Sequence, residues 1–375
     1  MGYPVTMPVL SHPPLLVLCH HPEEDAGVLM VPLKALFSEG RDFSALGRGD
    51  LHYICVREKG AYAAACEWIR RHPDGVAVYN GGYVFTHWTT LRILAACNWR
   101  YHNRQVAYWR EGATLLRDIT GMEGGGRWRR CIRRLQWRIT HRFLLNQRTW
   151  HVVNNRQCKQ LIMFLFGIEP VRIVVSGSTI NVSECPVADR LSDRNGFRLC
   201  MAGELTHRKG LDIFVDFADK HREWQGRRWE YTWFGGGENW LNIIKARPVG
   251  KRATACGMTF AGHVSPLPVA LVDQDIFLLT SREEPFGVVA LEALACDLPV
   301  FCFETAGISE FVPDEFICWD PDDMIEKVKT YLKNMDRYPP GFFRRMAEQR
   351  GHDGFYRGAW ERLFRGLRAE VRAEG

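Results

Sequence analysis

The 375-residue chain exceeds the usual size of a single domain, so we predict two domains. Hydrophobic residues make up 46% and charged residues 25%, which is typical of soluble globular proteins and excludes a disordered, collagen-like or coiled-coil chain. No apolar run approaches the roughly eighteen residues of a membrane-spanning helix. The net charge of +6 is moderate. A signal peptide begins with a positively charged region, but the first Lys or Arg of this chain is Lys34, so we expect a cytoplasmic protein without a signal peptide.

Short apolar runs alternate with amphipathic segments in the first half of the chain, which is typical of buried strands alternating with helices. We predict helices over residues 61–71 and 86–98. The predicted strands cover residues 15–19, 51–56, 76–79, 105–109, 151–153 and 172–175. Alternating units of this length indicate a parallel sheet with helices on both faces.

A strongly basic segment interrupts this half, with eight arginines and no acidic residue between Arg127 and Arg148. Its apolar residues recur every three or four positions and predict an amphipathic helix over 127–148. Three interpretations stay open: a solvated helix packed on its own domain, a helix on an anionic membrane surface, or a helix on nucleic acid, for which no motif is present. On the membrane interpretation, the residues at the membrane or acceptor side are Trp128, Arg129, Arg130, Arg133, Arg134 and Trp137.

The polar stretch 184–196 predicts a linker, and a second series of strands and helices follows it. The predicted elements are strands at 198–202, 231–234, 259–262, 276–280, 299–303 and 317–319, and helices at 211–221, 288–295 and 322–333. Two such series predict an α/β protein with two Rossmann-like domains, whose parallel sheets face a ligand cleft. The predicted boundaries are 1–185 for the N-terminal domain, 186–355 for the C-terminal domain, and 356–375 for a last helix that packs back toward the N-terminal domain.

Twelve cysteines are scattered along the chain without any CxxC pair, and the closest two are Cys296 and Cys302. This spacing favours reduced, buried thiols over a disulfide framework. The chain has no HExxH motif, and the adjacent His20 and His21 are not spaced to share one metal ion. We therefore expect no metal site and no cofactor.

The chemistry-bearing residues concentrate in the second half, where strand 276–280 leads through a loop into helix 288–295. A helix N-terminus carries partial positive charge and unpaired N–H groups. The amides of Phe286, Gly287 and Val288 are therefore candidates to hold a diphosphate without a metal ion.

Two glutamates flank this expected anion site: Glu284 in the loop and Glu292 inside the helix. Carboxylates accept hydrogen bonds from sugar hydroxyls. The alternative is a pair of surface glutamates, but Glu292 lies between the apolar Leu291 and Ala293, which favours a role in binding.

Two further loops follow strands of the same domain. One begins at Gly203 and ends in Arg208 and Lys209, where a doubly wound sheet places phosphate-bearing ligands. The other contains Gly235 and Gly236, which free the backbone to approach a ligand closely. A solvated basic pair and a flexible turn are the alternatives, but three such loops in one domain favour a binding site.

Taken together, these residues resemble a known family. The run 275–295 looks like the EX7E signature of the family 4 retaining glycosyltransferases, which have the GT-B fold, since seven residues separate Glu284 from Glu292. The loop 203–210 is similar to the family's "KG" loop, and residues 305–310 are similar to its loop after the next strand.

The resemblance implies roles for individual residues. Arg208 and Lys209 would hold the donor diphosphate, Glu284 the sugar hydroxyls and Glu292 the ribose. The implied catalytic residues are Glu284, Arg208 and Lys209, and the implied donor-binding residues are Gly203, Gly235, Gly236, Phe286, Gly287, Val288 and Glu292. The family often has a histidine near the sugar, for which the candidates are His20, His21 and His87.

The resemblance covers residues 150–335, and the chain departs from the family pattern at two positions within it. Glu204 stands where the family often has Arg, which removes one expected phosphate contact. Ser176 stands where Asn is usual.

The implied activity is that of a retaining glycosyltransferase, which moves a sugar from a UDP- or GDP-sugar to a lipid-linked or cell-surface glycan acceptor in polysaccharide or glycolipid biosynthesis. Expected partners are the nucleotide-sugar donor, the glycan or glycolipid acceptor and an anionic membrane, with peripheral attachment to the cytoplasmic face of the inner or plasma membrane. No nucleic acid is expected. The alternatives are a soluble acceptor, or a non-catalytic basic protein that binds membrane or nucleic acid, which the intact Glu284 and Lys209 disfavour.

Overall fold

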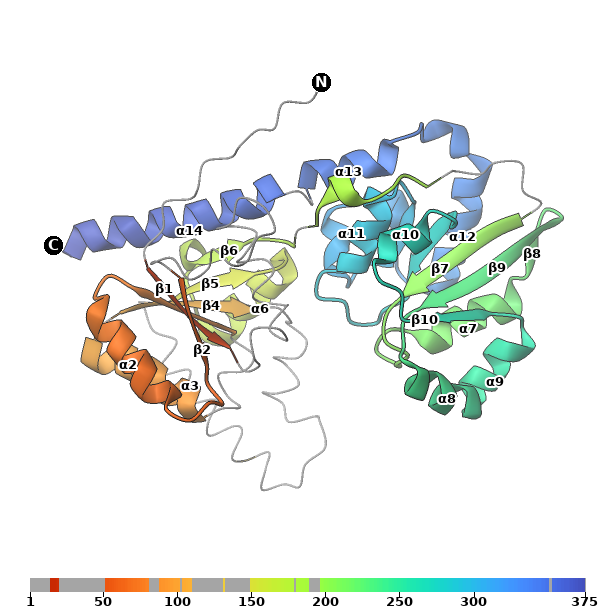
Figure 1. The fold of residues 1–375 in the computed structure, drawn as a ribbon. Coiled ribbons are helices and arrows are strands. Elements are labelled where there is room, and N and C mark those ends of the chain that lie inside the picture. Colours follow the sequence, from red (N-terminus) through yellow and green to blue (C-terminus); the bar gives the residue numbers. More distant parts are fainter. Residues whose placement is uncertain are drawn as a thin grey trace. The chain divides into compact units, whose positions relative to one another are not determined.

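The computed structural model describes residues 14–19, 51–80, 88–101, 103–109, 131, 149–178, 180–188, 196–350 and 353–374. The chain divides into two compact units, one formed by Met1–Gly177 with Tyr356–Gly375 and the other by Ser178–Phe355 (Figure 1). The C-terminal segment thus belongs to the same unit as the start of the chain.

The first unit is built on a parallel sheet with the strand order β2-β1-β3-β4-β5-β6. Its strands are β1 (Leu15–Cys19), β2 (Leu51–Cys55), β3 (Val76–Asn80), β4 (Arg104–Trp109), β5 (Thr149–Val153) and β6 (Ile173–Val175). Its helices are α2 (Ala61–Arg71), α3 (Trp88–Ala96), a π-helical turn (Cys97–Tyr101), α6 (Arg156–Phe166) and α14 (Asp353–Glu374).

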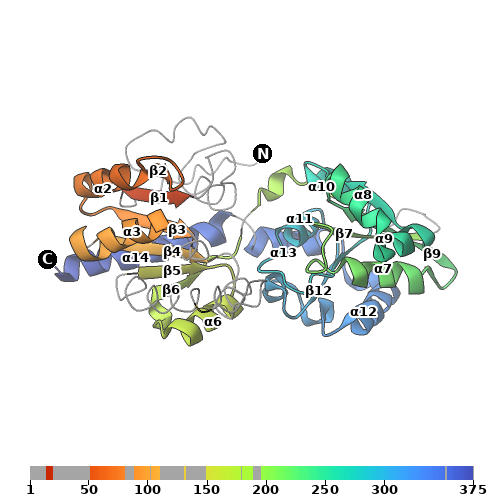
Figure 2. The same ribbon diagram turned by 90° about the horizontal axis from the view of Figure 1, so that it is seen from below.

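The two faces of this sheet bury two separate sets of side chains, because successive residues of a strand point to opposite faces. Leu16 and Leu18 belong to the apolar cluster under α2, α3 and α6, whereas Leu15 and Val17 belong to the cluster under α14. Figures 1 and 2 show α14 on one face of the sheet and α2 and α3 on the other. The last helix of the chain therefore completes the core of the first unit.

Helix α14 is fastened to the sheet by polar contacts as well as apolar ones. Glu370 accepts a hydrogen bond of 3.2 Å from Trp150 Nε1 and lies 3.0 Å from Arg172 Nη2 and 3.6 Å from Arg104 Nε. Trp150 also lies directly against Gly366, where an added Cβ atom would stand 2.2 Å from the indole ring. The absence of a side chain at Gly366 therefore lets the helix reach the sheet.

We expect Gly366→Ala to lower the stability of the first unit by about 1–3 kcal/mol, since the new methyl group overlaps Trp150. Gly358→Ala is the matched control on the same helix, because its Cβ would meet only the far end of Arg362 at 3.8 Å. Alanine should there raise stability by up to about 1 kcal/mol through helix propensity. Thermal and urea unfolding compare the two variants, and equal effects would contradict this account of the docking.

The second unit has the strand order β10-β9-β7-β11-β12-β13, with all of these neighbours parallel. Its strands are β7 (Gly196–Ala202), β8 (Glu223–Trp224), β9 (Arg227–Phe234), β10 (Thr259–Gly262), β11 (Ile276–Leu279), β12 (Val300–Phe303) and β13 (Ile317–Cys318). Its helices are α7 (Leu211–Lys220), α8 (Glu238–Ala246), α9 (Pro248–Ala255), α10 (Leu267–Leu271), α11 (Val288–Ala295), α12 (Pro321–Lys333) and α13 (Phe342–Arg350). Every residue of β11 and β12 is buried, so helices and loops cover both faces of the central sheet.

The predicted α/β class with two parallel sheets is confirmed, and the differences from prediction are local. The short β8 pairs antiparallel with β9, where an entirely parallel sheet was expected. Gln225 and Gly226, both with positive φ, form the turn between the two strands. Among the described residues, no helix is long and apolar enough to cross a membrane.

The boundary between the units falls at Gly177 and Ser178 rather than at residues 185 and 186. Arg344 accounts for this shift, because its guanidinium donates hydrogen bonds to the carbonyls of Val182 and Cys185. These bonds tie the segment that follows Ser178 to the second unit. The expected basic helix 127–148 lies outside the described residues, apart from Cys131.

Candidate functional site

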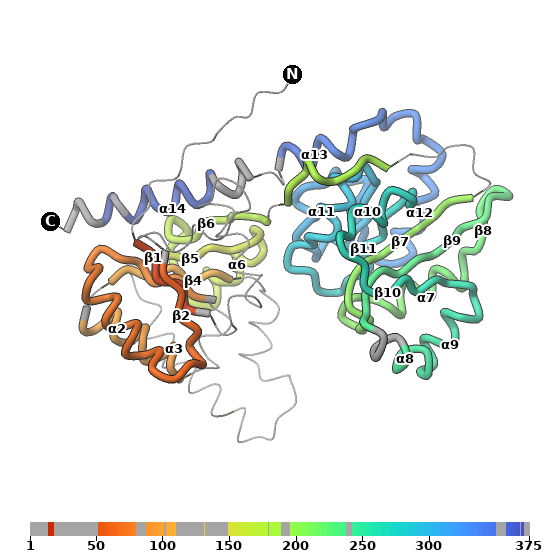
Figure 3. The backbone as a smooth tube through the Cα atoms, viewed as in Figure 1, coloured from red at the N-terminus to blue at the C-terminus, as the bar shows by residue number. Residues whose placement is uncertain are grey.

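The candidate site lies at one edge of the second sheet, where the loops after β7 and β11 come together. The two strands are neighbours and run parallel, so their carboxyl ends meet at the same edge. Figure 3 labels both strands in the second unit. Gly210 brings the loops into close contact, since an added Cβ atom there would stand 1.9 Å from the carbonyl oxygen of Thr280. Its φ of +74° also favours glycine.

An ion pair joins the two loops. Lys209 Nζ lies 2.6 Å from Glu284 Oε2, and the two side chains are only 14% and 8% exposed. Ser281 Oγ donates a second hydrogen bond of 3.1 Å to the same oxygen. Desolvating two charges is costly, so such a pair is weak evidence for stability. Its position at the carboxyl end of a parallel sheet is typical of a binding site.

Arg208 lies beside this pair and is more open to solvent. Its Nη1 donates to the carbonyl of Glu283 at 3.4 Å, and its Nη2 lies 3.8 Å from Glu204 Oε2. Glu204 is 74% exposed, so this interaction is screened by water and weak. Glu204 therefore interacts only weakly with Arg208.

Helix α11 starts at the same loop and presents its N-terminus there. Gly287 is its N-cap, in the left-handed conformation with φ of +96°. Phe286 before it is buried and packs edge-on against Phe311, with ring centroids 5.1 Å apart. Val288, the first helical residue, is exposed. The first turn of a helix has N–H groups without partners inside the helix, so this turn can receive an anion.

The glycines at the ends of β7 and β9 pack backbone against backbone. Gly235 has φ of +115°, and a Cβ atom on it would stand 2.2 Å from the carbonyl oxygen of Gly203. Gly236 has φ of +84°, and a Cβ atom on it would stand 2.5 Å from Cδ1 of the Leu205 side chain. Gly235 N also donates to the carbonyl of Gly262 on β10. Close packing, rather than a flexible turn, therefore requires these glycines.

Glu292 lies on α11, where its side chain is partly buried. Burial raises its pKa to about 7, from 4.5. Both the neutral and the ionised form are thus populated near pH 7, and a carboxyl group with a pKa this far from its usual value is a candidate functional residue.

The raised pKa of Glu292 predicts a pH-dependent stability. The folded protein binds the proton more tightly than the unfolded chain, so stability should fall as pH rises from about 4.5 to 7 and stay reduced above that range. Glu292→Gln removes this penalty, which amounts to up to about 3 kcal/mol. The melting temperature of the variant should therefore be higher than that of the wild type at pH 8 and equal to it at pH 4.5.

Glu223→Gln, at an exposed glutamate, serves as the control, and its difference in melting temperature from the wild type should not change with pH. A constant difference between Glu292→Gln and wild type over this pH range would contradict the assignment.

Sequence reasoning missed several residues of the site. Ser281 binds Glu284, and Thr280, Asp212 and Arg282 hold the two loops together. Their only sequence signal is a position just after a predicted strand or at the start of a predicted helix. The candidates His20, His21 and His87 and the expected membrane-side residues lie outside the described part of the chain. Within that part, no three His, Cys, Asp or Glu side chains are grouped to hold a metal ion.

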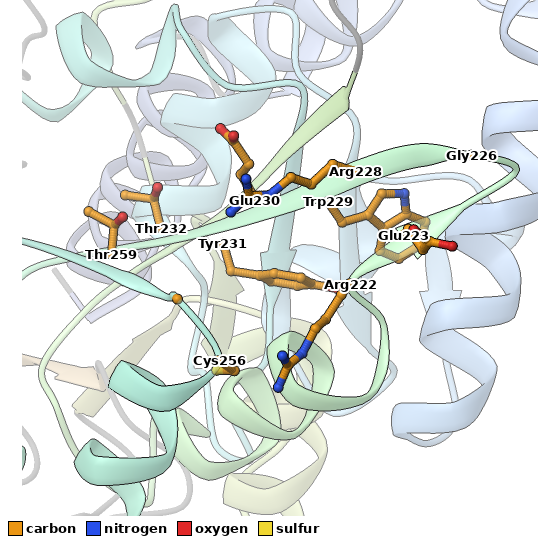
Figure 4. Close-up of a pocket in the computed structure, with 11 residues that line it drawn as sticks. Arg222, Glu223, Gly226, Arg228, Trp229, Glu230, Tyr231, Thr232, Cys256 and Thr259 are labelled. Carbon is orange, nitrogen blue, oxygen red and sulfur yellow. The ribbon is translucent and has the colours of Figure 1, made fainter.

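A hollow of about 590 Å³ lies elsewhere in the second unit (Figure 4). It is lined by Arg222, Glu223, Gly226, Arg228, Trp229, Glu230, Tyr231, Thr232, Cys256, Gly257 and Thr259. These residues come from β8 and β9 with the residue before β8 and the turn between the two strands, and from the segment that runs from the end of α9 to the start of β10. The hollow therefore contains none of the candidate site residues, which follow the opposite ends of the strands.

The second unit is similar in sequence to glycosyltransferases. Residues 196–334 match the family model described as "Glycosyl transferases group 1". A phosphatidylinositol N-acetylglucosaminyltransferase subunit of Arabidopsis thaliana is 23% identical over 178 residues, which are 46% of this chain and 39% of that protein. Glycogen synthase of Mycobacterium tuberculosis is 30% identical over 151 residues, 40% of this chain and 36% of that protein. The chain thus spans well under half the length of these curated relatives.

Similarity of fold extends over both units. The crystal structure of Anabaena HepE in complex with UDP and glucose aligns with 97% of this chain and 100% of that chain, with a TM-score of 0.66 and 14% identity. The sucrose-phosphate synthase of Thermosynechococcus elongatus aligns with 96% of this chain and 100% of that chain, with a TM-score of 0.67 and 15% identity. This likeness confirms the expected GT-B fold.

Proposed function

We propose that the chain is a glycosyltransferase that uses a nucleoside diphosphate sugar as donor. The observation that carries the proposal is the meeting of Lys209, Glu284 and the N-terminus of α11 at one edge of the second sheet. A cation, a helix N-terminus and a carboxylate match the diphosphate and the hydroxyl groups of such a donor. The matching family model over 196–334 and the fold relative bound to UDP and glucose support the same activity.

The proposed chemistry follows from charge. Breaking the bond between sugar and phosphate builds negative charge on the departing nucleoside diphosphate. Lys209, Arg208 and the amides at Phe286, Gly287 and Val288 would stabilise that charge as it forms, which lowers the barrier more than it strengthens substrate binding. We assign the sugar hydroxyls to Glu284 and the ribose to Glu292, with no metal ion or cofactor. Transfer should retain the anomeric configuration.

The ion pair gives the site a defined starting state. Without donor, Lys209 is neutralised by Glu284 at 2.6 Å. A bound diphosphate offers Lys209 a second anionic partner. The hydroxyl groups of the sugar then offer Glu284 hydrogen-bond donors in addition to the ammonium group of Lys209. The pair thus holds both side chains in place with their charges balanced before substrate arrives, which reduces the ordering cost of binding.

The decisive experiment measures release of free nucleoside diphosphate from a panel of UDP- and GDP-sugars. Wild type should turn over at least one donor, and Lys209→Met should reduce its transfer about 100-fold, since one preorganised electrostatic partner is worth roughly 3 kcal/mol. Glu284→Gln should also abolish most transfer while binding nucleoside diphosphate almost normally.

Lys251→Met, at an exposed lysine on α9, is the matched control and should behave as wild type. Absence of turnover with every donor, or a normal rate in Lys209→Met, would refute the assignment.

We propose a lipid-linked or cell-surface glycan acceptor, reached from a membrane surface by a peripherally bound enzyme. The basic composition of residues 127–148 supports this, as does the name of the Arabidopsis relative, which specifies phosphatidylinositol. The name of the mycobacterial glycogen synthase favours a soluble glycan instead.

The two acceptor classes predict different behaviour with anionic liposomes. Each arginine near an anionic surface contributes about 1 kcal/mol, so four of the eight would supply roughly 4 kcal/mol. Changing Arg129, Arg130, Arg133 and Arg134 to Glu should abolish co-sedimentation with liposomes and leave donor binding unchanged. The control carries the same change of charge at exposed positions of the second unit, namely Lys220, Arg228, Arg247 and Lys251.

The wild type and the control variant should both sediment, and high salt should release them because it screens exposed charges. A wild-type protein that ignores anionic liposomes at low salt would favour the soluble acceptor.

A further inference from the structure

Residues 207–209, which include the site cations Arg208 and Lys209, are hydrogen-bonded to residues 280–282 of the loop after β11. Three consecutive carbonyls of this loop accept hydrogen bonds from the start of the other loop. The carbonyl of His207 accepts from Arg282 Nη1 at 2.8 Å, that of Arg208 from Arg282 N at 2.9 Å, and that of Lys209 from Thr280 Oγ1 at 3.2 Å. Arg282 provides two of the three bonds.

Arg282 is in turn fixed by a carboxylate on the helix that follows the basic loop. Its Nη1 and Nη2 each donate a 2.7 Å hydrogen bond to a different oxygen of Asp212, in the first turn of α7. This fork geometry is the strongest arrangement for an Arg–carboxylate pair, and it restricts the guanidinium to one plane. Burial opposes ionisation of Asp212, but the hydrogen bonds and charge of Arg282 outweigh it and lower the pKa of the carboxyl group.

The same helix offers a comparison. Asp216, also on α7, pairs with Arg252 of α9 at 2.7 Å, with similar exposure of both side chains. That pair joins two helices and touches neither loop. A structural role in holding α7 in place is thus available to both pairs, whereas only Arg282 also bonds the backbone beside Lys209.

Resting on the proposed function, we propose that Arg282 and Asp212 are positioning residues, which hold the backbone of residues 207–209 so that Arg208 and Lys209 meet the donor diphosphate. Neither residue needs to touch the donor. Their effect is transmitted through the two bonds that Arg282 donates, to the carbonyls of His207 and Arg208. Without the fork, the guanidinium of Arg282 is no longer held against the carbonyl of His207, so the backbone beside the two cations loses one of its fixed contacts.

The test is calorimetric titration with UDP and GDP, combined with a double-mutant cycle. Arg282→Met should weaken binding about tenfold, and Asp212→Asn should weaken it less, because the amide still accepts one bond from the guanidinium. Arg282→Lys should restore part of the loss. In a Lys209→Met background, Arg282→Met should weaken binding by clearly less than tenfold, since only Arg208 is left for it to position.

Arg252→Met is the matched control and should bind like wild type, even where its melting temperature falls as far as that of Arg282→Met. Normal binding by Arg282→Met, or the same tenfold loss in the Lys209→Met background, would overturn the positioning role while leaving the proposed function intact. A wild type that binds neither nucleotide would overturn both. Circular dichroism verifies that each variant is folded.

Discussion

The ion pair of Lys209 with Glu284, 2.6 Å long and mostly removed from water, requires the loops after β7 and β11 to keep a fixed arrangement. The candidate site of the second unit depends on this constraint. Each charge is costly to desolvate without the other, so the loops that carry them must stay in register. The structure meets this requirement with close backbone contact at Gly210, with hydrogen bonds from Thr280 and Arg282 to the basic loop, and with the fork to Asp212. The loops behave as one assembly rather than as two surface turns.

The parallel sheet makes this assembly possible. In parallel sheets all carboxyl ends lie at one edge, so loops distant in sequence become neighbours. Residues 203–210 and 280–287 meet there because β7 and β11 pair directly. The glycines after β7 and β9 reach the same edge, where they pack too closely for side chains. The hollow at the start of β9 lies away from this edge and has no part in the proposed chemistry.

Helix α14 illustrates a different dependence, between the ends of the chain. The apolar cluster that includes Leu15 and Val17 of β1 is completed by Trp360 and Phe364, far away in sequence. The contact of Gly366 with Trp150 and the ion pairs of Glu370 fix the helix on this face. The first unit is thus covered on both faces only when the last helix has been added.

The sequence alone determined the alternation of strands and helices, since burial imposes a period of two or of 3.6 residues on apolar side chains. Helices 61–71 and 288–295 and strand 259–262 were predicted to the residue. Local motifs also singled out Lys209, Glu284 and Glu292 as candidate site residues.

Tertiary structure decided what those motifs contact. The pairing of Lys209 with Glu284, and the bonds from Arg282, join residues more than seventy positions apart, so no local pattern records them. The domain boundary moved for the same reason, because Arg344 binds carbonyls at Val182 and Cys185 from a distant helix. Backbone carbonyls carry no signature in sequence, since every residue has one, and only the folded chain shows which are bound.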